Sequence, residues 1–112
     1  MSIETKINNL IESINNCMNQ YAQYYSQSQD EYERQYRSPY PVYSTAKSLQ
    51  QQAEWAFKPI GNYIRELKSI HPDIGEDINK QVSNWSKNIH KIISDNVKAQ
   101  WKEYDYQRFN NY

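Results

Sequence analysis

The sequence predicts an all-α protein, an antiparallel up-down-up three-helix bundle with long helices. Only two glycines and four prolines occur among 112 residues, whereas sheets depend on tight turns that need glycine. Apolar residues recur at steps of three and four over most of the chain, the heptad-like spacing of helix faces and coiled coils. A short second connection favours neighbouring antiparallel helices. We therefore expect residues 1–112 to form a single helical domain.

The first helix is expected over residues 2–36. Its apolar stripe is aliphatic up to Met18 and phenolic from Tyr21 onward. Residues 37–43 read Arg-Ser-Pro-Tyr-Pro-Val-Tyr, and two prolines in this spacing favour extended, polyproline-like backbone that ends a helix. This segment is the predicted connection to the second helix.

The second helix is expected over residues 44–70, with Ser44 or Thr45 as its N-cap. Its apolar stripe continues through Pro59 without a break. An interior proline removes a backbone hydrogen bond and clashes with the preceding turn, at a cost of about 3 kcal/mol. We therefore predict a helix kinked at Pro59, or two short coaxial helices, with Gly61 easing the bend.

The third helix is expected over residues 73–109. Asp73 is followed three residues later by Glu76, which is the pattern of a capping box, so Asp73 is the predicted N-cap. Isoleucine, valine and tryptophan at helical spacing form the apolar face of this helix. Its direction in the bundle is parallel to the first helix.

Composition narrows the classes of function. Thirteen basic and thirteen acidic residues balance, so no overall charge attracts the chain to nucleic acid or to a membrane. Glu4 and Glu12 interrupt the N-terminal apolar stripe, unlike a signal peptide, and no apolar run approaches the length of a membrane span. A cytoplasmic protein without a membrane partner is expected. Cys17 is the only cysteine, which excludes an intrachain disulfide and indicates a buried thiol on the first helix.

Aromatic residues are predicted to collect at one pole, where the ends of the first and third helices meet beside the start of the second. Tyrosine and tryptophan are enriched at interfaces because one end of each ring is apolar and the other can stay hydrated. The predicted docking surface, for another protein or a second copy of the chain, comprises Tyr24, Tyr25, Tyr32, Tyr36, Tyr40, Tyr43, Trp101, Tyr104, Tyr106 and Phe109, with Tyr112 beyond them. The alternative is that these rings pack the first helix against the third.

A stripe of lysines is predicted on the third helix. Lys80, Lys87, Lys91, Lys98 and Lys102 are spaced seven, four, seven and four residues apart, so they share one helix face. Such a stripe fits contacts with nucleic-acid phosphates, and Trp101 near its end could stack a base. The alternative is a solvated face opposite the core. Nucleic acid is therefore the alternative partner.

The sequence contains no pattern for a catalytic nucleophile, a phosphate-binding loop or a zinc cage, so no catalytic residue, cofactor or metal is predicted. One short pattern indicates an enzyme instead. Arg65 and His71, separated by five residues, resemble the Arg-x4–6-His signature of HEPN ribonucleases, which are small helical domains. The resemblance covers seven residues, with Glu66 in place of the usual polar residue and Pro72 after the histidine. It implies metal-independent cleavage of RNA by Arg65 and His71, whereas a histidine at such a junction otherwise caps the preceding helix.

The function that the sequence favours is a non-enzymatic protein-interaction module. Two forms of this role are expected: an oligomeric adaptor, or a small inhibitor of a larger complex such as one of host defence. The inhibitor form follows from small size, the absence of a catalytic pattern, and many Asn, Ile, Lys and Tyr residues, whose codons are AT-rich, as in some bacterial and mobile-element genomes.

Overall fold

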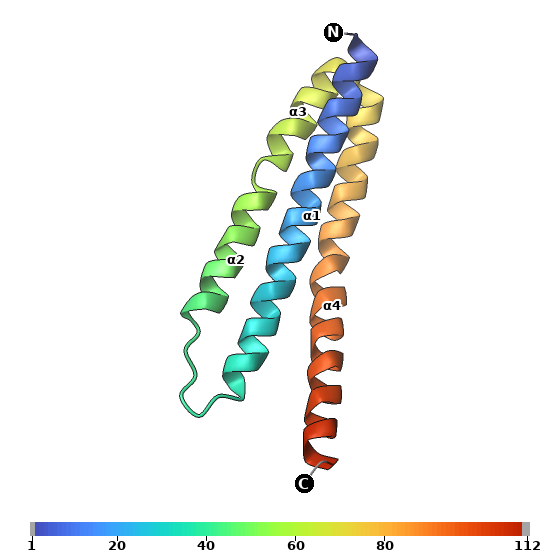
Figure 1. Ribbon diagram of the computed structural model, residues 1–112. Helices are drawn as coiled ribbons and strands as arrows, with labels where there is room; N and C mark the ends of the chain where they lie inside the picture. The colour runs from blue at the N-terminus through green and yellow to red at the C-terminus, as the bar shows by residue number, and fades with distance from the viewer. Residues whose placement is uncertain (1, 111–112) are drawn as a thin grey trace.

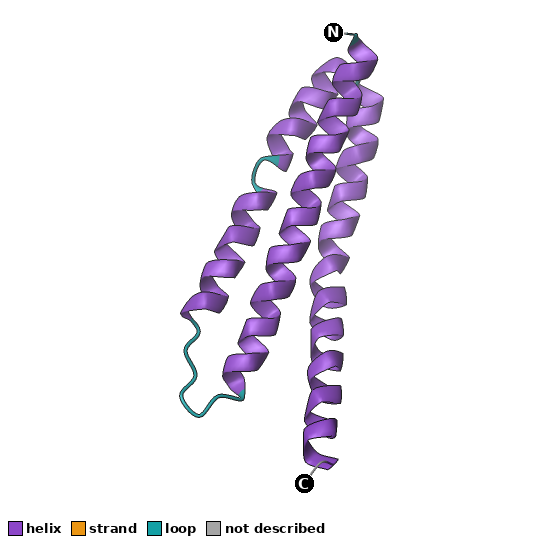
Figure 2. Ribbon diagram, in the orientation of Figure 1, coloured by secondary structure: helices purple, strands orange, loops and turns teal. Residues whose placement is uncertain are grey.

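The computed structural model describes residues 2–110, which form helices joined by short connections and contain no strand. The helices are α1 (Ile3–Tyr36), α2 (Ser44–Phe57), α3 (Ile60–Ile70) and α4 (Pro72–Asn110). α1 runs in one direction, α2 and α3 return beside it, and α4 runs parallel to α1 (Figure 1; Figure 2). The result is a rod of 63 × 24 × 21 Å. The predicted all-α, up-down-up bundle is confirmed.

The returning arm, made of α2 and α3, is divided at Pro59. This agrees with the second of the two predicted forms, two short helices. α2 ends at Phe57, and the backbone N–H of Tyr63 donates to the carbonyl of Pro59 at 3.2 Å in the first turn of α3. Proline has no N–H to continue the preceding helix, and its φ of −68° suits a helix start. Gly61 is not what permits the break, because a Cβ there would meet no atom within 4 Å and its φ is not positive.

The aliphatic core lies in the half of the rod where α3 is the returning arm. Its buried side chains come from α1, α3 and α4, and they are Leu10, Ile14, Ile60, Ile64, Leu67 and Val82. Cys17 is half-buried beside them, and burial raises the pKa of its thiol. The predicted place of Cys17 on the apolar face of α1 is confirmed, although the thiol is only partly enclosed.

The other half of the rod is open, because α2 and α4 lie on different sides of α1. α1 packs against each of the other helices, whereas α2 makes no comparable contact with α4. On the α2 side the contact uses small side chains: Ser28, Ala46 and Ala53 are fully buried. Arg37 and Asp30, which contact α4, lie about 180° and 160° around α1 from Ser28 at 100° per residue. In the half of the rod that contains α2, the helices α1, α2 and α4 therefore form a layer rather than a closed bundle.

The connection between α3 and α4 consists of His71 alone, and it corrects the predicted N-cap. α4 begins at Pro72, and the backbone N–H of Ile74 donates to His71 Nδ1 at 3.2 Å. His71 is therefore the N-cap, with proline at the first helical position, where its missing N–H costs nothing. Asp73 lies within the first turn instead, and Glu76 forms an ion pair with Lys68 at 3.3 Å instead of completing a capping box.

Two other features of these connections matter for stability. A Cβ on Gly75 would lie 2.7 Å from Lys68 Cα and 2.8 Å from Lys68 N, so glycine permits the close approach of α4 to α3. At the start of α2 the N-cap is Tyr43, without a side-chain hydrogen bond, and not Ser44 or Thr45 as predicted. The Tyr43 ring packs on Tyr32 instead, with centroids 5.6 Å apart, which fixes the entry into α2.

Among the described helices, none has the length and apolar character to cross a membrane.

Candidate interaction surface at the open pole

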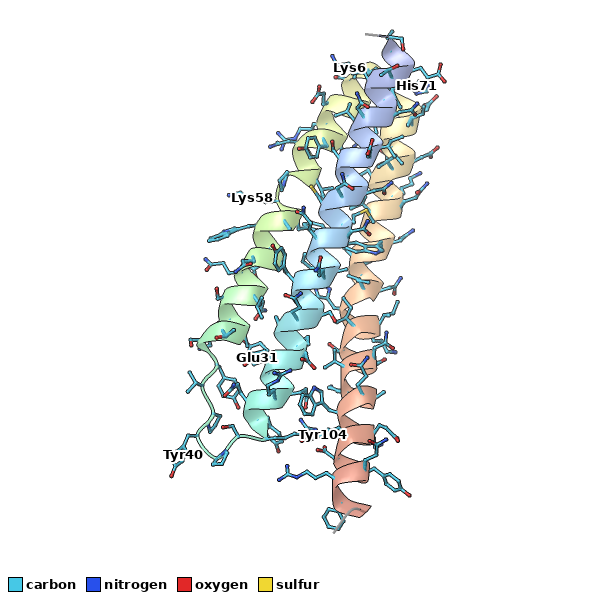
Figure 3. The ribbon with its side chains drawn as sticks, viewed as in Figure 1. Lys6, Glu31, Tyr40, Lys58, His71 and Tyr104 are labelled. Atoms are coloured by element: carbon cyan, nitrogen blue, oxygen red, sulfur yellow. The ribbon has the colours of Figure 1, made fainter. Side chains whose placement is uncertain are left out.

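The open pole is formed by the ends of α1 and α4, the start of α2, and the connection Arg37–Tyr43. Figure 3 shows Tyr40 at the outer tip of this connection and Tyr104 on α4, on opposite sides of the end of α1. The structure brings most of the predicted aromatic residues to this pole. Tyr24 and Tyr25 are exceptions: Tyr25 lies eleven residues before the end of α1, a distance of about 16 Å along the helix. Tyr112 lies outside the described residues.

Tyr25 belongs to an aromatic cluster in the middle of the rod. The Tyr21 ring stacks on Tyr25 and meets Phe57, Trp85 and His90 edge-on, with all four centroids within 5.9 Å. The cluster joins α1, α2 and α4 at the point where the closed half ends. Tyr21 and Tyr25 of the phenolic stripe of α1 therefore serve packing, which is the alternative that the sequence left open.

A hydrogen-bonded chain passes through this cluster. His90 Nδ1 lies 3.1 Å from the carbonyl oxygen of Ser86, and a carbonyl can only accept, so Nδ1 carries the proton. His90 Nε2 then accepts from the Tyr21 hydroxyl. Burial raises the pKa of Tyr21, as do the nearby Tyr25 and Glu54. No local sequence pattern indicates a partner for His90, since Tyr21 is 69 residues away.

Trp101 is held firmly between α4 and the end of α1. Its indole N–H donates to Asp30 at 2.9 Å, and the Arg37 guanidinium lies over the ring, 4.6 Å from its centroid. Arg37 also binds Asp105 through two nitrogens at 2.8 and 2.6 Å. An additional bond at 2.8 Å joins Arg37 to Glu33. Trp101 is therefore a packed residue that fixes the end of α4. Its indole is not free for docking or for stacking on a base.

Five other aromatic residues at the pole remain exposed. The exposed fractions are 75% for Tyr36, 87% for Tyr40, 50% for Tyr104, 66% for Tyr106 and 85% for Phe109. Tyr36 and Tyr40 flank the α1–α2 connection, and the other three lie on the last turns of α4. Single exposed apolar residues are ordinary, but a cluster at one end of a molecule marks an interaction site.

A pocket of about 400 Å³ lies beside the connection, lined by Tyr32, Glu33, Tyr36, Tyr43 and Lys47. The Tyr32 hydroxyl donates to the Gln50 side chain at 3.2 Å, so this ring is fixed. The hydroxyls of Tyr36 and Tyr43 and the Lys47 ammonium have no hydrogen-bond or ion-pair partner among residues 2–110. Three phenol rings thus line a pocket that retains three free donors.

The lysine stripe is where the sequence places it. Lys80, Lys87, Lys91, Lys98 and Lys102 are all exposed on α4. None of them is paired with an acidic side chain in the part of the chain that the structure describes. Asp77 and Asp95, also on α4, are exposed as well and dilute the field of the stripe.

The pair suggested by the ribonuclease resemblance is also on the surface. Arg65 is exposed on α3, and His71 uses its Nδ1 to cap α4. This capping differs from the expected one, which was directed at the last carbonyls of the preceding helix. Among residues 2–110, no three metal-ligating side chains gather as a candidate metal site.

Trp55 is an exposed residue that the sequence analysis did not single out. It is 61% exposed on α2, and its position nine residues after the buried Ala46, two and a half turns of helix, places it about 180° away. Its position on the helical wheel, opposite the alanines, was the signal that could have indicated it.

Comparisons with known proteins give no further indication of function: no protein-family model, no curated protein and no solved structure matches this chain.

Proposed function

We propose that this protein is a non-enzymatic interaction module that docks a partner protein through its open pole. The observation that carries the proposal is the group of five exposed aromatic residues at that pole, with exposed fractions of 50–87%. Tyrosine is one of the residue types enriched among the hot spots of protein interfaces. They contribute large contact areas with few rotatable bonds to be ordered on binding.

The rings that are not exposed make this surface rigid. Trp101 is fixed by Asp30 and Arg37, and Tyr32 is fixed by Gln50 and Tyr43. A surface that is ordered before binding loses less conformational entropy when a partner docks. The packed aromatic residues therefore hold in place the helices that carry the exposed ones, which supports docking.

The test is capture of a partner from lysate of the source cells with immobilised protein. We expect a stoichiometric partner that is lost when Tyr104, Tyr106 and Phe109 are replaced together by serine. Trp55→Ser is the matched control, because it removes an equally exposed aromatic residue on the far side of α2, and it should retain the partner. Capture of no stoichiometric protein, or equal capture by the triple variant, would refute docking through the α4 end.

Once a partner is known, its own activity separates the two forms of the role. An inhibitor of a larger complex, such as one of host defence, lowers the activity of that complex when added at equimolar amounts. An adaptor leaves the activity unchanged and joins two components in one particle, which the mass of the assembly measures.

The lysine stripe supports a second candidate, binding of nucleic acid, because its five ammonium groups are exposed and unpaired within residues 2–110. Phosphate contacts of this kind release counterions and weaken as salt rises. We expect the Lys87→Glu/Lys91→Glu variant to lose any such binding, whereas Lys58→Glu, away from the stripe, retains it. Unchanged mobility of RNA and DNA in wild-type protein at low salt would exclude this function.

A further inference from the structure

The connection between α1 and α2 presents an unusual backbone to solvent. Pro39, Tyr40, Pro41 and Val42 are all exposed. The two prolines have no N–H group, the N–H of Tyr40 donates to Ser38 Oγ at 3.3 Å, and that of Val42 donates to Gln35 Oε1 at 3.0 Å. No backbone donor of this segment is therefore free.

The carbonyl groups of the same four residues are unpartnered within residues 2–110. A surface that docks here must supply hydrogen-bond donors and accommodate apolar side chains. Pairing with the edge of a β-sheet is excluded, because a ladder needs N–H groups from both strands. The segment bends at Ser38–Tyr40, but it shares two features with the proline-rich segments that aromatic grooves recognise: closely spaced prolines and a backbone that offers only acceptors.

The protein carries such a surface itself, immediately beside this segment. The tyrosine pocket is lined by three phenol rings and holds about 400 Å³. Its free donors are the hydroxyls of Tyr36 and Tyr43 and the ammonium of Lys47. The connection thus offers acceptors without donors, and the pocket offers donors without acceptors.

The connection cannot enter the pocket of its own chain. Gln35 holds Val42 from the α1 side, and the Tyr43 ring packs on Tyr32 directly after it. Both ends are therefore tied to the helices that form the pocket wall. A second copy has no such restriction, and a two-fold axis would use both complementary features twice.

We propose that two copies of this protein associate at their open poles, with residues 39–42 of each copy lying in the tyrosine pocket of the other. The inference rests on the docking surface of the proposed function and names a second copy of the chain as its occupant. The carbonyls of the connection accept from Tyr36, Tyr43 and Lys47 of the other copy. The Pro39, Tyr40 and Pro41 rings cover the phenols.

The test measures mass against concentration by sedimentation equilibrium. We expect a monomer–dimer equilibrium in wild-type protein, and a dissociation constant raised tenfold or more in Tyr40→Ser, the size typical of a hot spot. Tyr40 is suitable because its side chain makes no hydrogen bond or ring contact with residues 2–110, so its loss leaves the fold intact. Trp55→Ser is the control, and it should dimerise as wild type does.

A cross-link locates the contact. A photoreactive phenylalanine analogue placed at position 40, in a mixture of 15N-labelled and unlabelled protein, should join position 40 of one copy to residues 32–47 of the other. A wild-type protein that remains monomeric at the highest attainable concentration would overturn the inference, and so would a dimer unaffected by Tyr40→Ser or linked elsewhere. A monomer that still captures a different protein from lysate would refute only this inference and leave the proposed function standing.

Discussion

The Arg37 guanidinium binds both carboxylate oxygens of Asp105, 68 residues further along the chain, at 2.8 and 2.6 Å. Together with the indole of Trp101, which donates to Asp30, it joins the last turns of α4 to the end of α1. Bidentate pairing of this kind constrains orientation as well as distance. The position of Tyr104 relative to the connection at the open pole therefore depends on these two contacts.

The pH dependence of this pair is predictable in sign. Arg37 lowers the pKa of Asp105 below its ordinary value of 3.8. A carboxyl whose pKa is lower in the folded state stabilises that state above the unfolded pKa, and the contribution is lost as pH falls through the folded pKa. We expect the Trp101 indole N–H resonance to shift below about pH 4, as α4 separates from α1. Asp105→Asn should show the separated resonance already at neutral pH, and a resonance identical to that of the wild type would contradict this role for the pair.

Gly75 is expected to be sensitive to the smallest substitution. In Gly75→Ala the new methyl group would meet the Lys68 backbone at 2.7 and 2.8 Å, and backbone atoms cannot rotate away. Overpacking of this kind lowers the free energy of unfolding by about 1–3 kcal/mol. Gly61→Ala is the control: open space surrounds that position, and replacing a helical glycine should raise stability by about 0.5–1 kcal/mol. Urea denaturation measures both, and equal effects of the two substitutions would disprove the close approach of α4 to α3.

His71 allows its capping role to be separated from catalysis. His71→Ala removes the acceptor for the Ile74 N–H and should lower the free energy of unfolding by about 1 kcal/mol. His71→Asn supplies a good capping oxygen and should recover most of that loss. The ribonuclease hypothesis predicts RNA cleavage in the presence of a chelator that both variants lose. Cleavage that is the same in wild type and both variants would exclude a catalytic imidazole.

Ser28 is a buried polar group that the fold leaves unsatisfied. It is fully buried, and its Oγ has no hydrogen-bond partner in the described part of the chain. Removing an unpaired buried hydroxyl avoids its desolvation cost, so Ser28→Ala should raise stability by about 1 kcal/mol. The exposed Ser48→Ala on α2 measures the part that comes from helix propensity alone, which is about 0.5 kcal/mol. A Ser28→Ala variant less stable than wild type would show that the hydroxyl has a partner.

Tyr21→Phe tests the hydrogen bond to His90. The ring contacts remain, the donor is lost, and the free energy of unfolding should fall by about 1 kcal/mol at neutral pH. Tyr24→Phe is the control, since that hydroxyl has no partner among residues 2–110. Because the pKa of Tyr21 is raised above its ordinary 10.0, wild-type stability should fall as pH rises beyond 10. Tyr21→Phe should lose this component of the fall, and a pH profile parallel to that of wild type would count against a buried, protonated phenol.

The sequence predicts the helices well because their signals are local. Prolines at positions 39 and 41 end α1, and the apolar stripe of the returning arm survives the break at Pro59. The N-cap of α4 was predicted wrongly because two local patterns competed. Asp73 with Glu76 resembles a capping box, but a proline at position 72 fits the first helical position and makes His71 the cap.

The candidate surface was predictable only in part. Helical spacing places aromatic residues on faces, but it does not say which faces are covered by neighbours. That depends on α2 and α4 lying on different sides of α1, which is a tertiary property. Tyr32 and Trp101 are consequently packed while Tyr36 and Tyr104 are exposed. The Arg37–Asp105 contact spans 68 residues and has no local signature.

The division of the rod into a closed and an open half has a consequence for how the molecule comes apart. In the closed half, α1, α3 and α4 surround one aliphatic core, and their backbone amides should exchange with solvent only on global unfolding. In the open half, α4 packs mainly against α1 and has no comparable contact with α2, so separation of its last turns from α1 leaves that core undisturbed. Local unfolding should therefore begin at the tyrosine-rich end and proceed toward His71. α1 contributes to the packing of both halves.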